Sequence, residues 1–251
     1  MPTAKLQIPT PDGQADAFAA FPDDGERHPG VLFYMDIFGI RPELERKARE
    51  LAEHGYYVLV PNVFYRDGAA PLVELPEFVT QEVRQEAVAQ LMPLVQAQTP
   101  ERVLRDAAAY LEFLTSRPEV APGPVAAMGY CMGGGLALRT AAAHADQVAA
   151  VAAFHPGKLV SDAPDSVHRA VVPAITADVH IGHAETDMRP EAVSELNQVL
   201  DASGVRYTSE IYPGTVHGFT MSDTSAFDAA GLARHWERLL ALLDGALATR
   251  R

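Results

Sequence analysis

The chain has 251 residues, of which 48% are hydrophobic and 21% charged, so it can build a substantial core and lacks the polar composition of a disordered protein. Its 33 acidic and 20 basic residues give a formal net charge of -13, which argues against nucleic-acid binding. No run approaches the roughly 18 apolar residues that a membrane span requires. We therefore expect a soluble protein with no membrane association and no signal peptide.

Cys131 is the single cysteine of the chain, so no internal disulfide can form. This cysteine usage is typical of the reducing cytoplasm, where we expect the protein to act. We also expect a monomer or small homo-oligomer whose main partner is a small-molecule substrate.

From residue 30 onwards, apolar β-favouring runs alternate with segments of helical period. This alternation predicts an α/β fold with a mostly parallel central sheet flanked by helices. The predicted strands cover 30–35, 56–61, 124–130, 147–154, 174–182 and 205–212. The predicted helices cover 41–55, a segment opening at 99–100, 134–143, about 190–202 and about 226–247.

The first predicted helix shows the pattern most clearly, because Leu44, Ala48 and Leu51 share one face and Gly55 is placed to end it. No internal repeat, low-complexity tract or flexible linker interrupts the chain, so residues 1–251 are expected to form one domain.

Residues 61–98 depart from this regular alternation. Their prolines and irregular start predict an excursion across the strand ends that shapes a substrate pocket. The next helix opens at Thr99 and Pro100, which are a good N-cap and a good first helical residue.

The segment GPVAAMGYCMGGGLALRTAAA, residues 123–143, places Cys131 between a predicted strand and a predicted helix. A lone cysteine is more often a small buried hydrophobe. Here, however, Gly129 and Gly133 flank it as in a nucleophile elbow, the sharp strand-to-helix turn that exposes a reactive side chain. The positive end of the helix dipole favours a thiolate and any oxyanion formed nearby. We therefore favour a catalytic Cys131.

A thiol nucleophile needs a base, and in this fold the chain order is nucleophile, acid, histidine. His217, in YPGTVHGF, follows the last predicted strand, and its alternative role is that of a surface loop histidine. Glu185 and Asp187 follow the preceding strand. We choose Asp187 as the acid that orients the imidazole, although it could also be a helix cap or a solvated loop charge.

Two further histidines, His180 and His183, lie near this acid. They are three residues apart on an extended chain, so they point to opposite faces, which argues against a shared metal site.

Taken together, the sequence resembles the dienelactone hydrolase family, α/β hydrolases with a cysteine nucleophile. The resemblance runs nearly end to end and is carried by MDIFGI (35–40), YVLVPNVFYR (57–66), GYCMGGG (129–135), GHAETDMRP (182–190) and YPGTVHGF (212–219). It implies an α/β-hydrolase fold with Cys131, Asp187 and His217 as the triad. It also implies an oxyanion hole from the backbone N–H groups of Ile37 and Met132, with no metal or organic cofactor. The family's best-studied activity opens a cyclic enol lactone.

Two departures from the family pattern concern charge. The family has a glutamate just before IFG, paired with the resting thiol, whereas this chain has Asp36, which either tunes Cys131 or caps the turn into the next helix. The family's dienelactone enzymes have an arginine four residues after the histidine, where this chain has Met221. We therefore expect a less acidic substrate than dienelactone.

Arg84, in QEVRQEA, matches the family's other substrate-binding arginine only loosely. An amphipathic helix would present a solvent-facing arginine at this position anyway, and this is the interpretation we favour.

The leading hypothesis is thus a cytoplasmic hydrolase that cleaves a lactone or small carboxylic ester through a thioester intermediate. The alternative is a catalytically silent α/β-hydrolase-like binding module, which would have no need of Cys131, Asp187 and His217 together. A redox-sensing thiol would need a partner molecule, because the chain has no resolving cysteine.

Overall fold

The computed structural model describes residues 1–248, in which eight strands form one sheet of order β1-β2-β4-β3-β5-β6-β7-β8. β1 and β2 pair antiparallel, β2 pairs antiparallel with β4, and all other neighbours are parallel. The strands are β1 (Thr3–Thr10), β2 (Gly13–Ala20), β3 (Gly30–Tyr34), β4 (Tyr57–Pro61), β5 (Val125–Tyr130), β6 (Val148–Phe154), β7 (Asp178–Ala184) and β8 (Tyr207–Tyr212).

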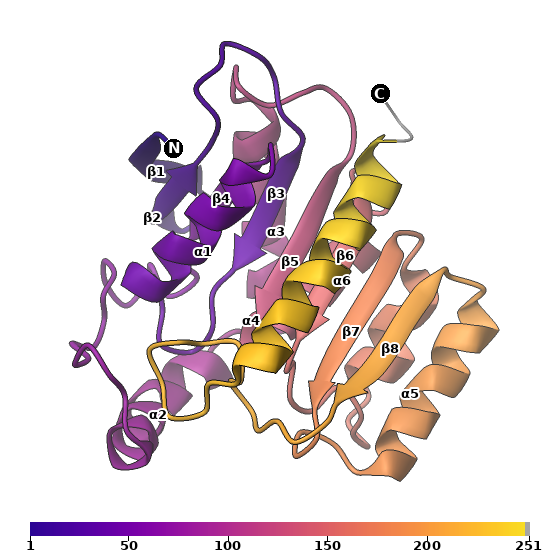
Figure 1. Cartoon of the computed structure of the whole chain (residues 1–251). Coiled ribbons are helices and arrows are strands. Elements are labelled where there is room, and N and C mark those ends of the chain that lie inside the picture. The colour runs from indigo at the N-terminus through magenta and orange to yellow at the C-terminus, as the bar shows by residue number, and fades with distance from the viewer. Residues whose placement is uncertain (249–251) are drawn as a thin grey trace.

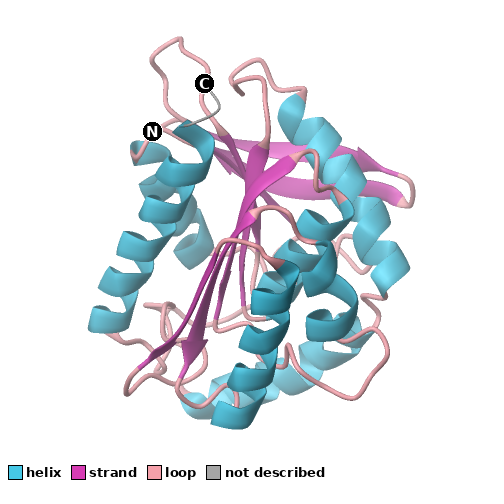
Figure 2. Cartoon of the chain, turned by 90° about the vertical axis from the view of Figure 1, so that its right-hand side faces the viewer, coloured by secondary structure: helices cyan, strands magenta, loops and turns pink. Residues whose placement is uncertain are grey.

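Helices cover both faces of this sheet, with α1 and α6 on one side and α3, α4 and α5 on the other (Figures 1 and 2). None of the helices within residues 1–248 is long and apolar enough to cross a membrane. The helices are α1 (Pro42–Glu53), α2 (Gln81–Gln96), α3 (Pro100–Thr115), α4 (Met132–Ala143), η1 (Val167–Val171), η2 (Val172–Ala174), α5 (Pro190–Ser203) and α6 (Ala229–Ala248).

The predicted α/β class is confirmed, and the six predicted strands correspond to β3 through β8. β7 begins at Asp178 rather than at residue 174, because the chain around Pro173 forms the short helical turn η2. α6 begins at Ala229 rather than near residue 226. A carboxylate oxygen of Asp228 accepts the N–H of Gly231 at 2.6 Å and so caps the helix start.

The sequence-based prediction missed the N-terminal hairpin of β1 and β2. Residues Pro11-Asp12-Gly13 supply the turn, with Gly13 at a φ of 141°. Such a Pro-Asp-Gly run between two extended segments is the signal that could have revealed it. The hairpin extends the sheet beyond β4 and ends it with the antiparallel strand β1.

Residues 62–80 cross the carboxyl ends of the strands and lead into α2, which lies beside the loop between β8 and α6 (Figure 1). Val79 ties the two segments together: its N–H donates to Asp223 O at 2.8 Å and its carbonyl accepts the N–H of Ser225 at 3.0 Å. The predicted excursion is therefore held against the loop that carries His217.

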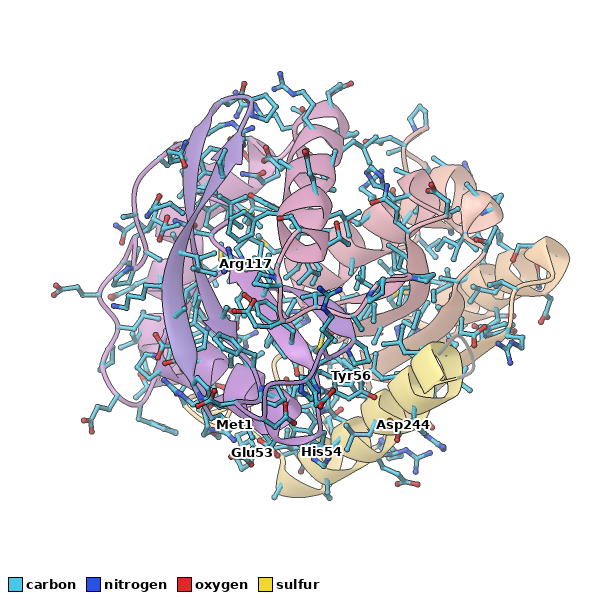
Figure 3. All side chains as sticks on the ribbon, turned by 90° about the horizontal axis from the view of Figure 1, so that it is seen from above. Met1, Glu53, His54, Tyr56, Arg117 and Asp244 are labelled. Atoms are coloured by element: carbon cyan, nitrogen blue, oxygen red, sulfur yellow. The ribbon has the colours of Figure 1, made fainter. Side chains whose placement is uncertain are left out.

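At the opposite end of the sheet, where the parallel strands begin, a side-chain contact joins α6 to the segment before β4 (Figure 3). There the Tyr56 hydroxyl donates to Asp244 at 2.7 Å and holds the last turns of α6 against the segment before β4. Figure 3 shows the two side chains close together. Cys131 and His217 lie at the other end, after β5 and β8.

Candidate active site

Cys131 occupies the turn between β5 and α4 with φ 54° and ψ -124°, a backbone conformation that L-residues rarely adopt. Its N–H donates to Phe154 O at 3.1 Å and its carbonyl accepts the N–H of Gly134 at 3.1 Å. Strained residues of this kind persist where the surrounding structure fixes them, and they cluster at functional sites. The chain therefore forms the predicted elbow at Cys131.

The flanking glycines are required by close backbone contacts. A Cβ on Gly129 would lie 2.1 Å from Gly133 O, and a Cβ on Gly133 would lie 2.4 Å from Met35 O. Both distances are far below van der Waals contact, so only glycine allows the turn to close and α4 to approach β3.

His217 and Asp187 meet above the ends of β7 and β8. Their Nδ1 and Oδ1 atoms are 2.6 Å apart, and because a carboxylate only accepts, Nδ1–H is the donor. The other Asp187 oxygen accepts the N–H of Ala184 at 3.0 Å, and the Asp187 side chain is 1% exposed. Glu185, the other acid considered from the sequence, accepts the N–H of Gly214 instead.

Burial opposes protonation of His217, but hydrogen bonds to Asp187 and Cys131 outweigh it and raise the His217 pKa to about 10. Because this pKa exceeds that of an unfolded histidine, the pair stabilises the fold fully below about pH 6.5. This contribution is lost as pH rises through about 10.

Asp187→Asn should lower the His217 pKa by about one pH unit or more, because the hydrogen bond to Asp187 is the strongest interaction that raises it. An NMR titration of the His217 ring proton measures this directly. Glu185→Gln is the matched control and should leave the titration unchanged. Equal effects of the two substitutions would show that Asp187 has no special relation to the ring.

Cys131 and His217 line one cavity of about 200 Å³ at the carboxyl ends of the strands. Its walls are mainly apolar. They are supplied by the loop after β3, by α2 and by the loop after β8, and include Ile37, Phe38, Val88, Met92 and Met221. The segment 61–98, predicted to shape a pocket, contributes through α2.

Asp36 lies in the wall of this cavity but is occupied by Arg41. The Arg41 Nη1 and Nη2 atoms donate to its two oxygens at 2.7 and 3.0 Å, and the N–H of Phe38 donates to Oδ1 at 3.0 Å. Of the two roles considered for Asp36, the contacts favour the turn cap, because both carboxylate oxygens accept hydrogen bonds from Arg41 or Phe38.

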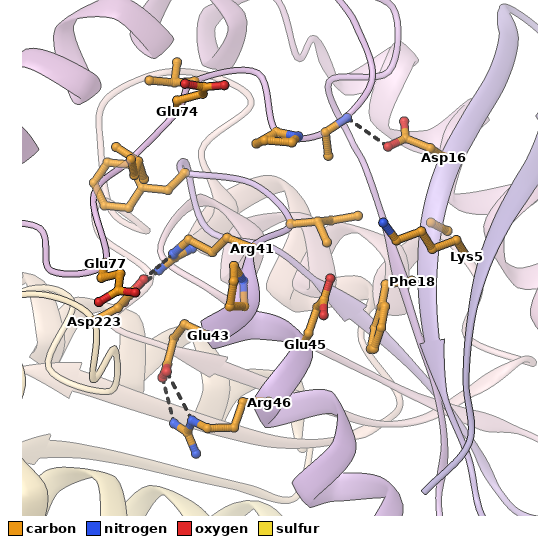
Figure 4. A pocket seen from close by; sticks show the side chains of 18 of the residues that line it. Lys5, Asp16, Phe18, Arg41, Glu43, Glu45, Arg46, Glu74, Glu77 and Asp223 are labelled. Carbon is orange, nitrogen blue, oxygen red and sulfur yellow. Dashed lines mark hydrogen bonds and ion pairs between the residues drawn. The ribbon is translucent and has the colours of Figure 1, made fainter.

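Arg41 was not singled out from the sequence, although it links two loops of the site. Its Nε donates to Asp223 at 2.6 Å, so one guanidinium joins the loop after β3 to the loop before α6 (Figure 4). Burial opposes the charge, but Asp36 and Asp223 outweigh it and keep the pKa of Arg41 above its usual range. The sequence feature that could have identified Arg41 is a basic residue immediately before Pro42, the first residue of α1.

Arg41→Met is expected to lower the free energy of unfolding by about 3 to 5 kcal/mol, because it leaves two carboxylates without their cation and Asp36 is almost fully buried. Urea unfolding with an unchanged m-value measures the loss. Arg49→Met, on the same helix, removes a pair with Glu45 in which the arginine is 39% exposed, and it should cost only about 0 to 1 kcal/mol. Similar losses for both variants would contradict this assignment.

Arg84 does not extend into solvent as favoured from the sequence. It is half-buried, lines the same cavity, and its Nη2 donates to His217 O at 3.0 Å. The solvent-facing interpretation is therefore wrong, because α2 turns this face toward the strand ends. Met221 is 1% exposed and gives the cavity an apolar wall where the family pattern has an arginine.

The two predicted oxyanion donors also lie at this end of the sheet. Met132 is the first residue of α4, so its N–H is one of the four without an intrahelical acceptor. Ile37 lines the cavity in the loop after β3. The contact between Gly133 and Met35 O brings the two segments together.

His180 and His183 link β7 to β8 through their side chains. His180 is hydrogen-bonded to Thr208 and His183 to Ser209, on opposite faces of the sheet. Burial lowers the pKa of each to about 4, so both are neutral. Within residues 1–248, no three His, Cys, Asp or Glu side chains are grouped so as to hold a metal ion.

A larger hollow of about 870 Å³ lies next to this cavity, between the β1–β2 hairpin, α1 and residues 70–77 (Figure 4). Charged side chains line it, including Lys5, Asp16 and Glu43, but its lining has neither cysteine nor histidine. Cys131 and His217 line the smaller cavity only.

A mostly parallel sheet with a strained strand-to-helix turn at its carboxyl end and a downstream histidine-acid pair defines an α/β hydrolase. The chain belongs to the dienelactone hydrolase family, whose model matches residues 15–247. Over 225 residues it is 27% identical to a carboxymethylenebutenolidase of Rhodococcus opacus, covering 85% of this chain and 80% of that one. It is 25% identical over 242 residues to a putative carboxymethylenebutenolidase of Methylorubrum extorquens, covering 94% and 78%.

Solved structures of similar proteins share the fold. A putative dienelactone hydrolase from Klebsiella pneumoniae superposes with a TM-score of 0.79 at 20% identity, covering 96% of this chain and 98% of that one. A dienelactone hydrolase-like promiscuous phosphotriesterase from metagenomic libraries gives 0.76 at 23% identity, covering 97% and 98%.

Proposed function

We propose that this protein is a hydrolase that cleaves a lactone or small carboxylic ester, in the cytoplasm, with Cys131 as nucleophile. The observation that carries the proposal is the convergence of Cys131 at a strained elbow and the bonded His217–Asp187 pair on one small cavity. Family membership and the names of the curated relatives support the reaction class.

In the proposed reaction the Cys131 thiolate attacks the carbonyl carbon and forms a tetrahedral oxyanion. Collapse breaks the carbon–oxygen bond of the ester, and protonated His217 gives its proton to the leaving oxygen. The acyl group is then held as a thioester. Neutral His217 next removes a proton from water, the hydroxide attacks the thioester, and the carbon–sulfur bond breaks to release the acid.

We assign the stabilisation of the oxyanion to the backbone N–H groups of Ile37 and Met132. Donors of this kind contribute about 3 to 4 kcal/mol each to the transition state in comparable hydrolases. Asp187 orients the imidazole of His217 and stabilises its charged form. Arg41 fixes the loop of Ile37 through its two bonds to Asp36.

The substrate proposed is small and less acidic than dienelactone, which carries one carboxylate. A cavity of about 200 Å³ leaves room for a compact acyl group. Asp36 is neutralised by Arg41, Met221 is apolar, and Arg84 is the arginine of the wall, beside a protonated His217 that is already paired with Asp187. The carboxylate of dienelactone would therefore meet one arginine in this wall, already bonded to the His217 carbonyl, where the family pattern has two.

A hydrolysis panel tests both reaction and substrate class. Purified protein is assayed with dienelactone, neutral enol lactones, saturated lactones and short aryl esters, with Cys131→Ala as background. We expect kcat/KM for the best neutral substrate to exceed that for dienelactone by about tenfold or more. Absence of hydrolysis across the panel would favour the binding-module alternative, and a clear preference for dienelactone would contradict the charge argument.

A further inference from the structure

The residue that follows β6, His155, shares an uncommon property with Cys131. In residues 1–248 these two are the non-glycine residues with positive φ, 38° for His155 and 54° for Cys131, and both line the same cavity. The N–H of His155 donates to Gly182 O at 2.7 Å, so the neighbouring strand holds the strained backbone. An observed outlier of this kind points to a functional constraint at this position.

The His155 side chain is 1% exposed and makes one hydrogen bond, between its Nε2 and Thr220 Oγ1 at 2.8 Å. Among the described residues its Nδ1 has no partner. Burial lowers the pKa of His155 well below its usual range, and the charge of His217 lowers it further. The ring is therefore neutral beside a protonated His217.

Aromatic packing aligns this neutral ring with the reactive histidine. The ring planes of His155 and His217 make an angle of 72° and their centroids are 5.2 Å apart, while the Tyr130 ring stacks against His155 with centroids 5.6 Å apart. This edge-to-face arrangement is a favoured geometry for aromatic pairs. His155 is thus fixed by Tyr130, the residue immediately before Cys131.

Thr220 lies three residues after His217 in the same loop. The His155–Thr220 bond consequently ties that loop to the end of β6. Without it, the ring would be oriented by the Asp187 bond and by the Arg84 bond to the His217 carbonyl.

We propose that His155 is a positioning residue: anchored by Thr220, its ring packs against the His217 imidazole and keeps it aligned between Asp187 and Cys131. The expected changes in kcat rest on the proposed hydrolase function. The effect of His155 on the His217 ring does not depend on turnover.

Thr220→Val and Thr220→Ser form the matched pair that tests this role, because valine removes the hydroxyl and serine keeps it. Thr220→Val is expected to lower kcat about tenfold with KM changed less than about twofold, and Thr220→Ser to retain kcat within about twofold. His155→Asn tolerates positive φ, removes the ring, and should lower kcat at least as much.

NMR titration of His217 supplies a readout without substrate. Thr220→Val and His155→Asn should lower the His217 pKa, because a misaligned ring bonds Asp187 less well, and Thr220→Ser should not. An unchanged pKa in both of the first two variants, or equal kcat losses for valine and serine, would overturn the proposal. If the wild type hydrolyses nothing while the titration shifts as expected, the positioning role holds and the proposed function fails.

Discussion

Replacing Cys131 with alanine is expected to lower kcat/KM for the best substrate of the panel by about four orders of magnitude or more, because no other group can form the thioester. The fold should be unaffected, since the side chain is only partly buried and small. Matched thermal unfolding of the two proteins checks this. Iodoacetamide labels one residue of the wild type and should label none in the variant, because the chain has one cysteine.

A double variant, Cys131→Ala with His217→Ala, tests whether the two side chains act as one catalytic unit. Residues that act as one catalytic unit show non-additive losses. Cys131→Ala, His217→Ala and the two combined are therefore expected to lose about the same activity, within roughly tenfold. Multiplied losses in the double variant would mean that the two side chains act independently. Turnover unchanged in Cys131→Ala would refute the nucleophile assignment outright.

Gly129→Ala is expected to lower the free energy of unfolding by more than about 4 kcal/mol, beyond the usual cost of overpacking. The added Cβ would meet the backbone of Gly133 at 2.1 Å, and a backbone atom cannot move aside as a flexible side chain can. Gly133→Ala should act similarly through the carbonyl of Met35. Urea unfolding measures both, and failure of either variant to accumulate as folded protein agrees with the same prediction.

Gly135→Ala, two residues further along α4, is the matched control. A Cβ there meets nothing within 4 Å, so the change should be neutral or stabilise the helix by up to about 1 kcal/mol. If Gly129→Ala unfolds at the same urea concentration as Gly135→Ala, the tight elbow is not a requirement of the fold.

The sequence alone predicted the α/β order of elements from residue 30 onwards, because apolar strands and amphipathic helices repeat with local periods. It also pointed to Cys131, Asp187 and His217 as candidates, since each follows a strand end in the chain order that a nucleophile, an acid and a base need. The residues adjacent to these three in the sequence, such as the glycines around Cys131, are what identify them as candidates.

Residues whose partners lie far away in the chain take their roles from contacts that form only in the folded protein. Arg41 reaches Asp223 across 182 positions, Arg84 reaches the carbonyl of His217, and His155 reaches Thr220. A local pattern cannot predict which distant loop a side chain will meet, because that depends on how strands order within the sheet. The same reason explains why Arg84 was expected in solvent and lies in the cavity.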